Sequence, residues 1–90
     1  MADAVTVHLP PALLALFPAA ASPVELPAST VAETMDALEA RWRGMRDRLC
    51  DSTPRIRPHI NVFVEGRRAA LETPLRPGAE IHIMIAMRGG

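Results

Sequence analysis

Residues 30–45, TVAETMDALEARWRGM, predict the main helix of the fold. Thr30 and Glu33 have the spacing of a capping box, in which the hydroxyl accepts from a backbone N–H three residues on and the glutamate reaches back. From there apolar side chains recur at steps of four and three, at Val31, Met35, Leu38, Trp42 and Met45. This spacing places them on one helical face, the face that a helix buries. Gly44 suits the position just beyond the helix end.

Two short strands are predicted before this helix. Val5, Val7 and Leu9 alternate with polar residues, which is the pattern of a half-buried strand. Residues 24–26, Val-Glu-Leu, alternate again between two prolines. We expect the two strands to form a hairpin with a long connection, in which the apolar residues 13–17 form a turn that closes one end of the core.

Two further strands are predicted after the helix. Residues 60–64, INVFV, form one strand, and the polar, proline-containing residues 51–58 before it form a loop. Residues 79–87, AEIHIMIAM, are rich in β-branched side chains and apolar on both faces, as in a central strand. One helix cannot cover two sheets in 90 residues. We therefore predict an α+β fold, a mixed four- to five-stranded sheet with one main helix packed on one face.

Length and composition limit the chain to one small domain, with 90 residues of which 49% are hydrophobic and 22% charged. We place this domain at residues 1–87 and a short flexible Arg-Gly-Gly tail at residues 88–90. The single cysteine, Cys50, excludes an intrachain disulfide, and we expect it to be a buried structural thiol rather than a persulfide carrier. His8, His59 and His82 are isolated, with no cysteine or carboxylate at ligand spacing, so we expect no metal site.

The charge is zero overall but uneven along the chain. Residues 1–40 contain five acidic and no basic residues, whereas residues 41–90 contain ten arginines and five acidic residues. We interpret this as two solvated faces, with a charge-matched protein partner as the alternative. A neutral chain has no overall field to attract nucleic acid or an anionic membrane, and we expect neither as a partner. No segment has the roughly 20 apolar residues of a membrane span, and no basic region marks a signal peptide, so we expect a cytoplasmic protein.

Three segments resemble a known family: residues 60–66, INVFVEG, residues 73–81, TPLRPGAEI, and the pair Gly89-Gly90. They are similar to the ubiquitin-like sulfur carrier proteins of the MoaD/ThiS family, including its CysO-like members, and the similarity covers nearly the whole chain. The resemblance implies the β-grasp fold of ubiquitin-like proteins. Ile85 and Ala86 stand where the family often has proline, so the subfamily stays open.

The resemblance also implies a carrier protein that is a cosubstrate rather than an enzyme. In this family an adenylyltransferase related to ubiquitin-activating enzymes joins the C-terminal carboxylate to AMP, and a sulfur donor, a sulfurtransferase or persulfide, converts it to a thiocarboxylate. The implied reactive group here is the carboxylate of Gly90, which Gly89 helps to thread into a narrow channel. The carrier binds no cofactor itself, since the activating partner uses the ATP.

A sulfur-accepting synthase is the implied recipient, of the molybdopterin (molybdenum cofactor) type or the cysteine type, and the chain could itself be the small subunit of a synthase such as molybdopterin synthase. The alternative is a ubiquitin-like modifier conjugated through Gly90 to lysines of target proteins, because both functions begin with adenylation. A third possibility is a β-grasp binding module with an inert tail.

Strand alternation predicts a partner-binding surface beside the tail. If Ile81, Ile83 and Ile85 face the helix, the residues between them face outward. The partner-binding residues expected on this outer face and the adjoining tail are Phe63, Met84, Ala86, Met87 and Arg88. Contiguous exposed apolar surface commonly marks a protein interface. We therefore expect this face to dock the activating enzyme.

Overall fold

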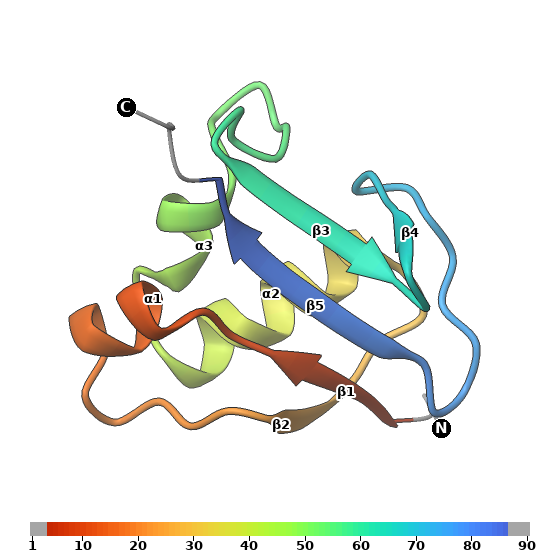
Figure 1. Ribbon diagram of the computed structural model, residues 1–90, viewed down its shortest axis with the longest axis horizontal. Coiled ribbons are helices and arrows are strands. Elements are labelled where there is room, and N and C mark those ends of the chain that lie inside the picture. The colour runs from red at the N-terminus through yellow and green to blue at the C-terminus, as the bar shows by residue number, and fades with distance from the viewer. Residues whose placement is uncertain (1–3, 87–90) are drawn as a thin grey trace.

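The computed structural model describes residues 4–86, which form one sheet with helices on one of its faces (Figure 1). The elements in chain order are β1 (Ala4–His8), α1 (Pro11–Leu16), β2 (Val24–Pro27), α2 (Val31–Arg41), α3 (Met45–Leu49), β3 (Ile60–Val64), β4 (Arg67–Arg68) and β5 (Glu80–Ile85). The five strands form a mixed sheet in the order β2-β1-β5-β3-β4. The predicted α+β fold of the β-grasp type is confirmed.

Strand β5 is the centre of the sheet, as the sequence predicts. It pairs in parallel with β1, where Val7 lies opposite Ile81, and antiparallel with β3, where Val62 lies opposite Ile83. These four side chains are buried. The alternate residues Glu80, His82 and Met84 are exposed, so the outer face of β5 is partly polar rather than wholly apolar. The helices cover one face only, which leaves the other face to solvent.

Helix α2 begins as the capping pattern predicts. The Thr30 hydroxyl accepts a hydrogen bond from the Glu33 N–H at 3.1 Å, and the Glu33 carboxylate accepts from the Ser29 N–H at 2.7 Å. The glutamate thus reaches one residue further back than a standard capping box. The predicted stripe is completely buried at Val31, Met35 and Leu38. Burial of each such side chain contributes roughly 1.5–3 kcal/mol, so this face holds the helix on the sheet.

The helix ends earlier than predicted. Trp42 caps α2 with an extended backbone, and Gly44 adopts a left-handed φ of 98° before α3 begins. Met45 is fully buried, but from this separate helix, while Trp42 is only partly buried against the core. The prediction of one continuous stripe through Met45 is therefore wrong. The physical reason is the glycine turn, which redirects the chain so that Met45 and Leu49 enter the core from the separate helix α3.

The connection between β1 and β2 contains helix α1, where the sequence predicts only an apolar turn at residues 13–17. Proline at the first helical position suits a helix start. Leu13 is buried, and Leu14 and Phe17 pack partly against the core, so this segment does close one end of it. Leu16 is 54% exposed. Within residues 4–86 no helix combines the length and the apolar character needed to cross a membrane.

Candidate functional site

The outer face of the sheet presents the described members of the predicted partner surface. Met84 on β5 is 52% exposed, Phe63 on β3 is half-buried, and Ala86 just after β5 is exposed. Phe63 lies opposite His82 in the antiparallel register, and Met84 lies opposite Asn61. Phe63 and Met84 are therefore diagonal neighbours with polar side chains between them. The predicted outward orientation is confirmed, but the surface is mixed rather than continuously apolar.

The chain leaves the sheet at Ala86, next to this outer face. The Ala86 N–H donates to the His59 carbonyl at 2.7 Å, a bond just beyond the end of β5. Ile85, expected to face the helix, is partly buried against the core. Met87, Arg88, Gly89 and Gly90 lie outside the described residues. Four residues of chain span at most about 14 Å, so the reach of Gly90 is set by where the central strand ends.

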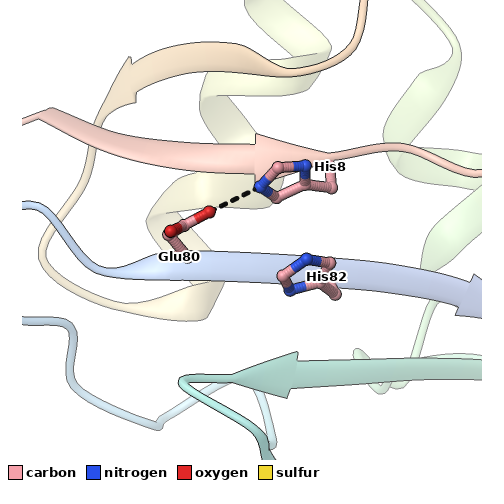
Figure 2. Close-up of side chains that lie close together, drawn as sticks. All are labelled: His8, Glu80 and His82. Atoms are coloured by element: carbon pink, nitrogen blue, oxygen red, sulfur yellow. Dashed lines mark hydrogen bonds and ion pairs between the residues drawn. The ribbon is translucent and has the colours of Figure 1, made fainter.

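Three side chains from two different strands lie close together on the outer face of the sheet. Figure 2 shows His8 at the end of β1 beside Glu80 and His82 on β5. The imidazole rings of His8 and His82 are stacked, with centroids 4.2 Å apart and planes within 2°. His8 Nε2 lies 2.7 Å from Glu80 Oε1. The prediction that the histidines are isolated is therefore wrong for His8 and His82.

Sequence spacing could not reveal this cluster, because His8 and Glu80 are 72 positions apart. The parallel pairing of β1 with β5 sets His8 directly beside His82, and Glu80 shares their face two residues earlier. The one available signal is strand alternation, which puts His8 on the polar side of the first predicted strand and Glu80 and His82 on the outward side of the last. His59, by contrast, lies in the turn before β3 and is exposed.

A hollow of about 590 Å³ opens between the loop after α3 and the segment after β4. Its lining includes the apolar side chains Ile60, Val62 and Leu71 and the arginines Arg55, Arg57 and Arg68. The Arg68 guanidinium also donates to the Asn61 side-chain oxygen on the outer face. Part of the predicted basic half of the chain is thus concentrated in one hollow beside β3.

Cys50 ends helix α3 and is 2% exposed. Burial raises the pKa of its thiol, and the nearby Arg46 guanidinium, which lowers it, offsets only part of this effect. A buried neutral thiol is a poor nucleophile, because the thiolate is the reactive form. The prediction of a buried cysteine is confirmed.

No protein-family model matches the chain, and no curated protein matches it either. Solved structures do. CysO in the crystal structure of the Amycolatopsis orientalis BexX/CysO complex is 30% identical, with a TM-score of 0.85, over 96% of this chain and 99% of that chain. Mycobacterium tuberculosis CysO is 24% identical, with a TM-score of 0.82, over 92% and 99% of the two chains. Small archaeal modifier protein 1 of Haloferax volcanii is 23% identical, with a TM-score of 0.80, over 94% and 99%.

The similarity to Mycobacterium tuberculosis CysO and to small archaeal modifier protein 1 shows a shared fold. The similarity to Amycolatopsis orientalis CysO also shows membership of the same family, because 30% identity extends over nearly the whole of both chains. The proteins compared are small carriers and modifiers rather than catalytic enzymes. The chain belongs to the ubiquitin-like sulfur carrier and modifier proteins, the MoaD/ThiS-like family.

Proposed function

We propose that this protein is a sulfur carrier whose reactive group is the carboxylate of Gly90. The observation that carries the proposal is the 30% identity with CysO over 96% of the chain. The position of β5 supports it, because the most central strand of the sheet leads directly toward residues 87–90. A tail that extends from a rigid central strand has a fixed starting point for insertion into an enzyme.

The chemistry begins at a carboxylate, which is a poor electrophile because oxide is a poor leaving group. An adenylyltransferase joins the Gly90 carboxylate to AMP and releases pyrophosphate from ATP. A persulfide sulfur of the donor then attacks the carbonyl carbon and displaces AMP. A thiol reductant cleaves the resulting acyl disulfide and leaves the thiocarboxylate on Gly90. The carrier contributes no catalytic group, so its part is to present the carboxylate.

The outer sheet face is the proposed docking surface for the activating enzyme. Phe63, Met84 and Ala86 belong to it, and we propose that Met87 and Arg88, the next two residues of the chain, also contact the enzyme. Because the tail spans at most about 14 Å beyond Ala86, the domain must bind closely for Gly90 to reach a nucleotide. CysO of Amycolatopsis orientalis occurs in a complex with BexX, which supports docking of this domain on a partner protein.

The likeness to CysO favours a cysteine-type carrier over a molybdopterin-type one. The recipient of the sulfur is then a synthase that accepts a thiocarboxylate, and the chain acts as its cosubstrate rather than as a permanent small subunit. We place the protein in the cytoplasm, where ATP supports adenylation.

Intact-protein mass spectrometry tests the carrier function. The 90-residue protein is incubated with its activating enzyme, ATP and a sulfur donor, and we expect a mass gain equal to the replacement of one oxygen by sulfur. Deletion of Gly89 and Gly90, and separately the change Gly90→Val, should abolish this gain without altering the melting temperature. An unchanged mass for the wild-type protein, or a gain that survives the deletion, would contradict the proposal.

Conjugation to lysines through Gly90 is the second candidate, supported by the fold shared with small archaeal modifier protein 1. The chain contains no lysine, so it could not form lysine-linked chains with itself. Trypsin cuts after Arg88 and would leave a Gly-Gly remnant on each modified lysine. Peptides that carry this remnant, present with the wild-type protein and absent after deletion of Gly89 and Gly90, would establish the modifier function.

A further inference from the structure

We propose that His8, Glu80 and His82 form a binding site for a divalent transition-metal cation, with Zn²⁺ as the ion of choice. One ligand atom from each residue can be chosen so that all three lie within 4.8 Å of one another. They come from two neighbouring strands and project from the same face of the sheet (Figure 2). The site uses none of the residues of the tail, although His82 shares the outer face with Phe63 and Met84.

The sheet fixes the backbone of this site before any metal arrives. His8 and His82 are directly paired in the parallel ladder between β1 and β5, and Glu80 pairs with Thr6 in the same ladder. Strand β5 is also bonded to β3 on its other side. The entropic cost of bringing ligands from the two ends of the chain together is therefore already met by folding, which favours a site of useful affinity.

The side chains must rearrange to reach ligand geometry. Zinc binds imidazole nitrogen at about 2.0–2.1 Å and carboxylate oxygen at about 2.0–2.2 Å, so donors in a tetrahedral set lie roughly 3.3 Å apart. His8 Nε2 and Glu80 Oε1, now 2.7 Å apart, must separate slightly. The stacked rings must tilt so that their nitrogen lone pairs converge. Side-chain exposures of 32% for His8 and 56% for Glu80 leave room for both movements.

His8 and Glu80 are joined by a hydrogen bond in this structure. A bound metal would replace that proton between the two side chains. In the neutral ring, Nε2–H of His8 donates to the Glu80 carboxylate. When Nε2 of His8 binds the metal, the single ring proton resides on Nδ1 instead, so the ring stays neutral. The Glu80 carboxylate, which accepted the hydrogen bond, then becomes a metal ligand. Neutral imidazole and ionised carboxylate are the forms that bind metals.

The donor set selects the class of ion. Two imidazole nitrogens and one carboxylate oxygen suit Zn²⁺, Cu²⁺ or Ni²⁺, whereas Mg²⁺ and Ca²⁺ prefer sites made wholly of oxygen. Three protein donors leave the fourth tetrahedral position to water, because the site lies on the open face of the sheet. Zinc needs no redox partner and is bound by this combination of residues in proteins generally.

Isothermal titration calorimetry of ZnCl₂ into tag-free, full-length protein tests the proposal. We expect saturable binding of one ion per chain. The variants H8Q, H82Q and E80Q should each bind at least about tenfold more weakly, because even the loss of a group that merely orients a ligand costs about 10–100-fold. The matched control is H59Q, which removes the third histidine, outside the cluster, and should bind as tightly as the wild-type protein.

Two spectroscopic measurements identify the ligands directly. Zinc should shift the ring-nitrogen NMR signals of His8 and His82 and leave those of His59 in place, and Co²⁺ should give the visible absorption of a tetrahedral site without a thiolate charge-transfer band. Circular dichroism confirms that each variant is folded. Absence of 1:1 binding, equal affinity of H82Q and the wild-type protein, or a thiolate band from Cys50 would each overturn the proposal.

Discussion

The carboxylate of Glu39, in the last turn of α2, accepts a hydrogen bond from the backbone N–H of Gly44 at 3.0 Å. It also accepts from the Arg46 N–H at 3.0 Å, within the first turn of α3. One side chain thus satisfies two donors at a helix start that has no side-chain cap of its own. Glu39 thus links the last turn of α2 to the first turn of α3, the helix in which Met45 is buried.

The pKa of Glu39 is held below the ordinary value by these bonds, the one from Gly44 first, with a smaller contribution from Arg43 and Arg46. A lowered pKa in the folded state means stability that is present at neutral pH and is lost as the pH falls through the folded-state pKa. We therefore expect E39Q to unfold at lower denaturant concentration than the wild-type protein at pH 7. This difference should begin to shrink near the ordinary glutamate pKa of about 4.3 and vanish once the pH is below the lowered pKa. The exposed residue Glu25 provides the control E25Q, which should change little. A deficit of E39Q that stays constant down to pH 2 would argue against the carboxylate.

Leu38 and Leu16 test the assignment of buried and exposed helix faces. Leu38 on α2 is 0% exposed, whereas Leu16 on α1 is 54% exposed. L38A should lower the free energy of unfolding by about 2–5 kcal/mol, because it removes buried methyl groups and leaves a cavity. L16A should change it by no more than about 0.5 kcal/mol, as surface substitutions usually do. Denaturant titrations of both variants provide the measurement, and similar losses in the two would refute the packing of α2.

Cys50 should be unreactive in the native protein and dispensable for sulfur transfer. Its thiol is buried and its pKa is raised by that burial, so little thiolate forms at pH 8. We expect slow labelling by iodoacetamide in buffer and complete labelling in guanidinium chloride. C50A should still acquire the thiocarboxylate on Gly90. Loss of sulfur loading in a folded C50A protein would instead make the thiol part of the carrier mechanism.

Met84 tests the docking face separately from the tail. A charge placed at this exposed position should weaken binding to the activating enzyme, because it would have to be desolvated in the interface. M84E should raise the KM for the carrier about tenfold or more and leave the melting temperature within a few degrees of the wild-type value. The control L16E adds the same charge at an exposed leucine of α1 and should leave the KM unchanged. Equal effects of the two changes would place the docking surface elsewhere.

The local elements of the fold were predictable from short stretches of sequence. Alternation at Val5 and Val7, the capping pair Thr30 and Glu33, and the β-branched residues 79–87 each depend on neighbours within one strand or helix. Gly44 predicted the end of α2 to within about two residues, but the separate helix α3 was not predictable, because the apolar spacing continues to Met45. The turn between α2 and α3 is stabilised by the hydrogen bonds of Glu39 to Gly44 and Arg46, which form only in the folded chain.

Three features follow from the sequence alone: the α+β class, the outward orientation of Phe63 and Met84, and the resemblance that led to the proposed role of Gly90. Only the tertiary structure brought His8 together with Glu80 and His82. The physical reason is that side-chain alternation in a strand is local, with a period of two residues, whereas a parallel ladder joins strands at a sequence distance that no local pattern encodes.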